Sequence, residues 1–153
     1  MNNVRLGILG SGEMGRYYVD SATKYNNHVD VVGITGGTRA PGLAKQYDVD
    51  YIPDFETMLK RDDIQGIVIA TPHQVHAEQV IASAEHGKHV LLEKPMAPSV
   101  PDCDAMIEAC KKAGTTLAMI KSLRYWAVMS RTKNVIDEGR IGEVRMIQVT
   151  SLY

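Results

Sequence analysis

The nine residues GILGSGEMG, Gly7 to Gly15, restrict the fold more than any other stretch of this chain. They overlap the apolar run that begins at Val4, which predicts a strand over residues 4–9. Beyond them, apolar residues recur at three-to-four spacing, which predicts a helix over residues 13–25. A chain that places glycines between a strand and a helix needs a backbone there that is free of Cβ atoms.

The glycines of this turn have the spacing Gly-x-Gly-x-x-Gly. Gly10 permits a tight turn, Gly12 lets the backbone approach a pyrophosphate, and Gly15 lets the helix pack on the strand. The helix N-terminus adds free amides and a partial positive charge. The motif alone is weak, but its place between a strand and a helix favours a dinucleotide site over a plain glycine-rich turn. The residues assigned to it are Gly10, Ser11, Gly12, Glu13, Met14 and Gly15.

Strand-like and helix-like stretches continue to alternate after this turn. Alternation of this kind predicts an α/β fold in which a doubly wound parallel sheet is covered on both faces. The length of 153 residues corresponds to about one domain. The further strands are expected at 29–35, 66–70, 89–92 and 116–120, and the further helices at 41–47, after Asp54, at 73–86 and at 99–113.

Composition and charge exclude several classes of function. The net charge is -1 and no apolar run is long enough to span a bilayer, so neither nucleic acid nor a membrane is an expected partner. Residues 1–3 lead directly into the first strand without a signal peptide, which favours a cytoplasmic location. Cys103 and Cys110 lie two turns apart in an expected helix, roughly 10 Å of rise. That distance is too long for a disulfide, so reduced thiols and no metal site are expected.

The end of the second expected strand bears on the choice of cofactor. NAD-selective sites usually carry Asp or Glu there, which binds the adenosine ribose. In this chain the sequence is ITGGTR, Ile34 to Arg39, with no acid. Thr35 would not repel a 2′-phosphate, and the Arg39 guanidinium can bind one. We therefore expect NADP(H) to be preferred over NAD(H); the alternative is that Arg39 is a solvated loop residue.

Two further stretches, ATPHQVHAEQV from Ala70 and GKHVLLEKPMA from Gly87, follow or contain expected strands. With the glycine turn, they resemble the Gfo/Idh/MocA family, which includes glucose–fructose oxidoreductase and inositol dehydrogenase. The triplet Glu93-Lys94-Pro95 is the most specific part of the resemblance, which covers essentially the whole chain. It implies a Rossmann domain followed by an α/β domain, and IDEGRIGEV, Ile136 to Val144, resembles the start of that second domain's sheet.

The resemblance implies an oxidoreductase that transfers hydride between a nicotinamide and a sugar, cyclitol or related polyol. Lys94 would polarise the substrate oxygen or transfer a proton during hydride transfer. Glu93 would lie beside it at the carboxyl edge of the sheet, where open α/β sheets bind ligands. A cis peptide bond before Pro95 is also implied. The alternative for this triplet is a surface lysine before a turn-forming proline.

Other site residues are likewise implied only by the resemblance. Thr71 and Pro72 would line the nicotinamide side of the cleft, and His73 stands where the family often has Asn. His76 matches a family histidine that we assign to the cofactor site, although a packing role is favoured for a lone histidine. Arg124 and Tyr125 resemble family residues near the substrate, with a charged loop over a packed aromatic ring as an equal alternative.

The family comparison also divides the chain into a dinucleotide-binding domain, residues 1–122, and the start of a substrate domain, residues 123–153. Residues 145–153, rich in Val, Ile, Thr and Tyr, predict a terminal strand. Its free edge would pair with another copy, giving a homo-oligomer, or fold against the Rossmann domain.

Family members are more than twice as long, and their remaining catalytic residues, commonly Asp and His, lie downstream. The resemblance therefore implies that this chain is part of a longer enzyme and is inactive alone. Two other functions are consistent with the same residues: a dinucleotide sensor without catalysis, and a structural module that binds a partner chain. The presence of Lys94 favours the enzyme.

Overall fold

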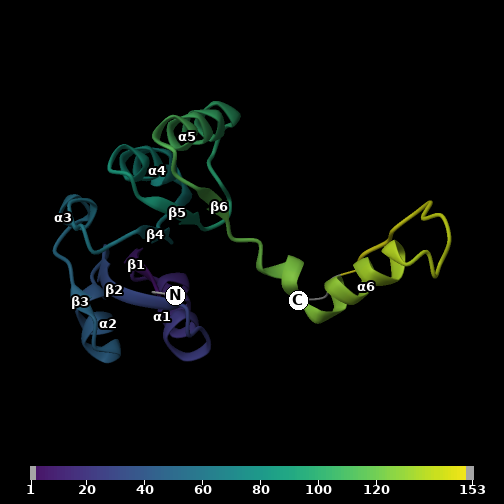
Figure 1. Cartoon of the computed structure of the whole chain (residues 1–153), viewed down its shortest axis with the longest axis horizontal. Coiled ribbons are helices and arrows are strands. Elements are labelled where there is room, and N and C mark those ends of the chain that lie inside the picture. The colour runs from purple at the N-terminus through teal and green to yellow at the C-terminus, as the bar shows by residue number, and fades with distance from the viewer. Residues whose placement is uncertain (1–2, 151–153) are drawn as a thin grey trace. The chain divides into compact units, whose positions relative to one another are not determined.

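The alternating strands and helices form a six-stranded parallel sheet with helices on both faces. The structure, a computed structural model, describes residues 3–150, and the chain divides into two units between Ile120 and Lys121 (Figure 1). The strand order β3-β2-β1-β4-β5-β6 is that of a Rossmann sheet. The strands are β1 (Val4–Leu9), β2 (Val29–Thr35), β3 (Asp50–Tyr51), β4 (Gly66–Ile69), β5 (His89–Leu92) and β6 (Leu117–Met119).

Two hydrophobic cores lie on opposite faces of this sheet, because successive side chains of a strand point in opposite directions. Ile8 belongs to the core beneath α1 and α2, and its neighbour Leu9 belongs to the core beneath α3, α4 and α5. All four residues of β4 are buried, as its continuous apolar run predicts. The helices are α1 (Glu13–Tyr25), α2 (Ala40–Tyr47), α3 (Phe55–Leu59), α4 (His76–Glu85) and α5 (Val100–Ala113).

The strand order creates a crevice at the carboxyl edge of the sheet. β1 pairs in parallel with β2 on one side and with β4 on the other, so the chain leaves β1 and β4 in opposite directions. Open α/β sheets bind ligands at such a switch point. The loops after β1, β2, β4 and β5 therefore meet at one edge.

The predicted elements of the first unit are confirmed, with small differences at their ends. Ser99 caps α5, and Gly114 ends it with a φ of 67°. The helix predicted over residues 73–86 is divided into a 3-10 turn, η1 (His73–Val75), and α4. β3 was not predicted, because a strand of two residues is too short to show an alternation of apolar and polar residues. Cys103 and Cys110 are free thiols, as expected.

The second unit differs from the prediction. It contains a 3-10 turn, η2 (Ser122–Tyr125), and a helix, α6 (Ala127–Asp137), neither of which was predicted. The strand predicted over residues 145–153 is wrong for residues 145–150, which form no regular element, while residues 151–153 lie outside the described residues. High strand propensity is insufficient without a neighbouring strand for the backbone. The expected homo-oligomer was based on the free edge of this strand, so it is no longer supported by that argument.

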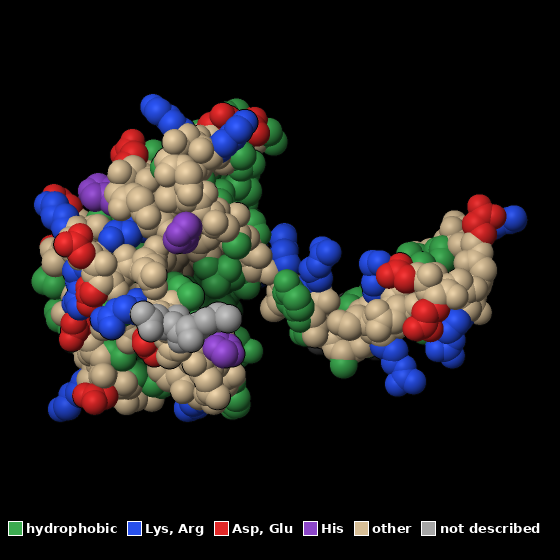
Figure 2. Space-filling model, in the orientation of Figure 1, with side chains coloured by type: hydrophobic (Ala, Val, Ile, Leu, Met, Phe, Trp, Pro, Cys, Tyr) green, Lys and Arg blue, Asp and Glu red, His purple; other side chains and the backbone are tan. Residues whose placement is uncertain are grey.

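Within residues 3–150, no helix is long and apolar enough to cross a bilayer. Acidic and basic side chains are interspersed over the face shown in Figure 2, in keeping with the net charge of -1.

Candidate functional site

The glycine turn after β1 has the backbone that its sequence requires. Gly10 has a φ of 113°, a conformation that side chains disfavour, and a Cβ there would stand 2.7 Å from the carbonyl oxygen of Ala70. A Cβ on Gly15 would stand 1.8 Å from the carbonyl oxygen of Gly10. These two glycines therefore bring α1 against the end of β1 at a distance that no other residue allows.

Gly12 lies in a different environment. A Cβ there would meet only the Arg39 guanidinium, at 3.9 Å from Nη2, so the space in front of the backbone is open and flanked by a cation. Gly12 is also the N-cap of α1, and no side chain accepts a hydrogen bond at this helix end. Unsatisfied amides and the helix dipole make such an end attractive to phosphate. The geometry therefore fits the pyrophosphate of a dinucleotide.

The loop after β2 packs directly on this turn. The Gly10 amide donates to the Thr35 carbonyl at 2.8 Å, and the Ser11 amide donates to the Gly36 carbonyl at 3.0 Å. Gly36 and Gly37 both have positive φ, and a Cβ on Gly37 would stand 2.7 Å from the Ser11 hydroxyl oxygen. Thr35 is fully buried, and its hydroxyl has no hydrogen-bond partner among residues 3–150.

Three loops enclose a cleft of about 460 Å³ at the carboxyl edge of the sheet. They are the loops that follow β1, β2 and β4, and the cleft lies wholly within the first unit. Arg39 is exposed beside it and forms no ion pair with another described residue. The lining residues are Gly10, Ser11, Gly12, Glu13, Met14, Gly36, Gly37, Thr38, Arg39, Ala70, Thr71 and Pro72.

The loop after β4 is fixed by side-chain hydrogen bonds. The Thr71 hydroxyl donates to Gln79 Oε1 at 2.5 Å. His76 is fully buried; its Nε2 lies 2.9 Å from the Thr71 carbonyl oxygen, and its Nδ1 lies 3.1 Å from the carbonyl oxygens of Pro95 and Met96. The side chain therefore has no exposed surface, and its contacts are of the kind that the packing alternative predicts. His73 lies at the start of η1, outside the residues that line the cleft.

Glu93 and Lys94 follow β5 and differ in exposure. Glu93 is buried, with 7% of its surface exposed, and the Tyr18 hydroxyl of α1 donates a hydrogen bond to its Oε2. Lys94 is exposed, and it forms no ion pair with the rest of residues 3–150. The Lys94–Pro95 bond is cis, as the resemblance implied. Neither residue lines the cleft described above.

Arg124 and Tyr125 belong to the second unit. Both line a hollow of about 550 Å³ formed by η2 and α6, together with Leu123, Met129, Ser130, Lys133 and Asn134. Both side chains are exposed.

Comparison with known proteins identifies the family. Residues 4–121 match Gfo/Idh/MocA, described as an oxidoreductase family with an NAD-binding Rossmann fold. The chain belongs to the Gfo/Idh/MocA family. The match spans the whole sheet of the first unit, including the glycine turn and the Glu93-Lys94-Pro95 triplet.

Relatives of this Gfo/Idh/MocA chain are enzymes of several kinds. The 2,7-anhydro-N-acetylneuraminate hydratase of Mediterraneibacter gnavus is 31% identical, over 94% of this chain and 38% of the relative. Inositol 2-dehydrogenase 3 of Saccharopolyspora erythraea is 30% identical, over 91% of this chain and 42% of the relative. The WlbA dehydrogenase of Bordetella pertussis, solved with NADH and UDP-GlcNAcA, superposes with a TM-score of 0.86 and 28% identity, over 93% of this chain and 42% of its own. The chain therefore spans about two fifths of the length of these relatives.

Sequence reasoning missed two parts of this Gfo/Idh/MocA site. Gly36 and Gly37 line the cleft but were not assigned to it, although a Gly-Gly pair at a strand end is itself a signal of positive φ. Tyr18 was not assigned to the site. Its contact with Glu93 joins positions 75 residues apart, and no local pattern marks such a pair.

Proposed function

We propose that this chain is the cofactor-binding part of an oxidoreductase that transfers hydride between a nicotinamide dinucleotide and a sugar, cyclitol or related polyol. The carrying observation is the open space in front of Gly12, between an uncapped helix N-terminus and the Arg39 guanidinium. Relatives named inositol 2-dehydrogenase and WlbA dehydrogenase, the latter solved with NADH and a nucleotide sugar, support the reaction and the substrate class.

In this proposal the cofactor lies across the carboxyl edge of the sheet. The turn Gly10–Gly15 would hold the pyrophosphate, and Thr71 and Pro72 would face the nicotinamide half. The nicotinamide, when bound, supplies or accepts the hydride. Lys94 is exposed at the end of β5, so its ammonium group can donate a hydrogen bond to a substrate oxygen and hold or release a proton there.

The second unit, which begins at Lys121, would contain the start of the substrate domain, whose boundary we place between residues 122 and 123. Several of its large apolar side chains are exposed: Tyr125 by 80%, Trp126 by 56% and Ile147 by 67%. Exposed apolar surface of this kind marks a unit that packs against further protein. Arg124 and Tyr125 would then offer a cation and a phenol to the substrate.

The same geometry favours NADP(H) over NAD(H). The loop after β2 contains no acid to bind a free 2′-hydroxyl, and the Arg39 guanidinium already lies beside Gly12. A guanidinium binds phosphate through two parallel hydrogen bonds, whereas a carboxylate at the end of β2 would repel the 2′-phosphate. The cleft between Gly37, Thr38 and Arg39 is therefore suited to a 2′-phosphate.

Calorimetric titration of the 153-residue chain with NADPH and with NADH tests both dinucleotide binding and the preference for NADP(H). Arg39→Ala is expected to weaken NADPH binding by about 1.5–3 kcal/mol, or about 10- to 150-fold, the range for hydrogen bonds to a charged group. NADH binding should hardly change. Lys45→Ala, which removes an exposed cation from α2, the helix that follows Arg39, is the matched control and should affect neither ligand.

The outcomes separate the two parts. Equal affinity of the unmodified chain for NADPH and NADH would contradict the NADP(H) preference alone. Failure to bind either dinucleotide would contradict the proposed function as a whole.

A further inference from the structure

Glu93 is the only buried acidic residue between residues 3 and 150. No Lys, Arg or His in that range forms an ion pair with it. A buried carboxylate without a cation is costly unless it accepts hydrogen bonds. Glu93 follows β5 directly and precedes Lys94, so this buried carboxylate lies at the carboxyl edge of the sheet, which the proposed function uses.

Tyr18 supplies the hydrogen bond that Glu93 needs. Its hydroxyl, reaching from α1, donates to Glu93 Oε2. Burial, and secondarily the hydrogen bond to Glu93, raises the pKa of Tyr18 well above its ordinary value, so the phenol keeps its proton and remains a donor.

The turn that carries Lys94 is thus held from two sides. On one side, Glu93 accepts from Tyr18 of α1, and its amide donates to the Ile69 carbonyl of β4 at 2.9 Å. On the other side, His76 of α4 lies 3.1 Å from the carbonyl oxygens of Pro95 and Met96. Lys94 lies between these two fixed points and is exposed.

We propose that Tyr18 is a positioning residue for the nicotinamide end of the site, acting through Glu93 on the turn that carries Lys94. The inference rests on the proposed function, because it assumes that this turn meets the nicotinamide half of the cofactor. Tyr18 is thereby assigned to neither the pyrophosphate nor the 2′-phosphate, although it belongs to the helix whose N-terminus faces the pyrophosphate.

The test compares two ligands that differ in the nicotinamide half. NADPH contains it, whereas adenosine 2′,5′-bisphosphate contains only the adenosine end with its 2′-phosphate. Tyr18→Phe in the 153-residue chain is expected to weaken NADPH binding about threefold to tenfold, the fold-change that corresponds to one hydrogen bond, and to leave the bisphosphate unchanged. Tyr17→Phe is the matched control, since Tyr17 is the adjacent, exposed tyrosine, and it should change neither affinity.

A second variant keeps the test independent of folding effects. Glu93→Ala removes the acceptor, so adding Tyr18→Phe to it should produce no further loss of NADPH affinity. Equal weakening of both ligands by Tyr18→Phe would indicate a general disturbance of α1 and overturn the inference. Unchanged NADPH binding would also overturn it, while the proposed function would stand. Failure of the unmodified chain to bind either ligand would overturn both.

Discussion

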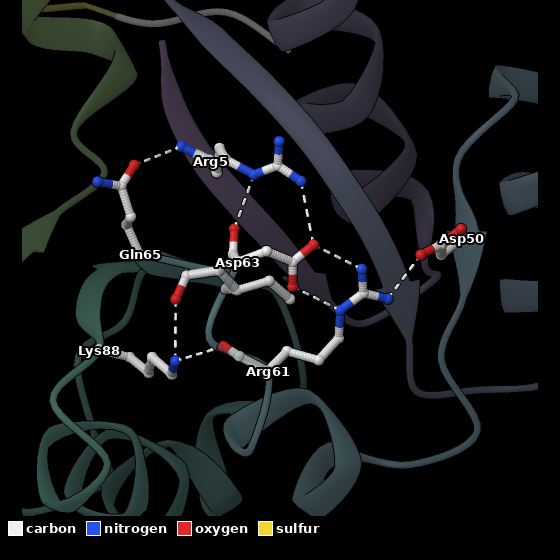
Figure 3. Close-up of polar contacts among 7 residues, drawn as sticks. Arg5, Asp50, Arg61, Asp63, Gln65 and Lys88 are labelled. Carbon is white, nitrogen blue, oxygen red and sulfur yellow. Dashed lines mark hydrogen bonds and ion pairs between the residues drawn. The ribbon is translucent and has the colours of Figure 1, made fainter. Parts of the chain in front are cut away.

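The two edges of the sheet differ in how their charged side chains are paired. At the amino edge, the strands begin among paired charges (Figure 3). Asp63, in the loop before β4, accepts hydrogen bonds from Arg61 and Arg5, with Oδ2 2.7 Å from Arg61 Nη2 and 3.0 Å from Arg5 Nη2. Arg61 also donates to Asp50, the first residue of β3, at 2.6 Å. This cluster, which we call the amino-edge network, connects the starts of β1, β3 and β4.

At the carboxyl edge, charged side chains are available instead. Arg39 and Lys94 are exposed and form no ion pairs within the described part of the chain, and the turns there are built from glycine. A charge that is already paired within the protein contributes modestly to the stability of the fold, whereas an unpaired, exposed charge can contribute its interaction energy to a ligand. If the proposed function holds, the amino edge serves stability and the carboxyl edge serves binding.

The largest expected effect comes from breaking the carboxyl edge itself. Gly15→Ala would place a Cβ 1.8 Å from the Gly10 carbonyl oxygen, so α1 must move away from β1. We expect a loss of about 3 kcal/mol or more in the free energy of unfolding, measured by urea denaturation, together with loss of NADPH binding. Gly42→Ala is the control: its Cβ would meet nothing within 4 Å, and inside α2 the change should be neutral or stabilising. Tight NADPH binding by the Gly15 variant would show that this close packing is dispensable.

A smaller effect is expected from the amino-edge network. Arg61→Ala removes the hydrogen bonds to Asp63 and Asp50 and should lower the free energy of unfolding by about 1–2 kcal/mol, since the guanidinium is only partly buried. NADPH affinity should not change. Lys60→Ala, whose pair with Glu56 is exposed and screened by solvent, should have a much smaller effect on the free energy of unfolding. Weaker NADPH binding by the Arg61 variant would refute the division between the two edges.

The smallest effect is a dependence of stability on acid. Hydrogen bonds from the Arg61 guanidinium, and then from Arg5, hold the pKa of Asp63 well below its ordinary value. The ionised carboxylate therefore favours the folded state; its contribution is complete above about pH 4 and is lost as the pH falls further. Solvent screening keeps it small, because 38% of the Asp63 side chain is exposed. In urea denaturation series from pH 7 to pH 3, Asp63→Asn should flatten the decline below pH 4. An equally steep decline in the Asp63→Asn variant would show that other carboxylates cause the loss of stability in acid.

Much of the first unit could be predicted because its signals are local. The glycine turn, the caps at Asp54 and Ser99 and the fully apolar β4 are each encoded within a few residues. The cleft followed from them, because parallel strands bring their carboxyl ends together. The position of Arg39 beside Gly12 depends on a loop of only a few residues after β2, so it too could be anticipated.

The rest depends on contacts between distant segments. The bond from Tyr18 to Glu93 and the amino-edge network join side chains that no spacing rule connects. The tail shows the opposite error: residues 145–150 have the composition of a strand, but a strand also needs a neighbour, which composition does not supply. A packing role for His76 could be predicted, but not its partners, which are carbonyl oxygens from two different loops.

Lys88 adds a second kind of interaction at the amino edge, a charged donor bound to backbone carbonyl groups. Its ammonium group is buried and donates to the carbonyl oxygens of Arg61 and Ile64, at 2.6 Å and 2.9 Å, and to no carboxylate of residues 3–150 (Figure 3). Peptide carbonyls do not take up protons over the range in which aspartates do. Hydrogen bonds that do not depend on a carboxylate thus connect the loop between α3 and β4 to the start of β5. This loop can therefore keep its conformation after acid has neutralised the aspartates of the neighbouring ion pairs.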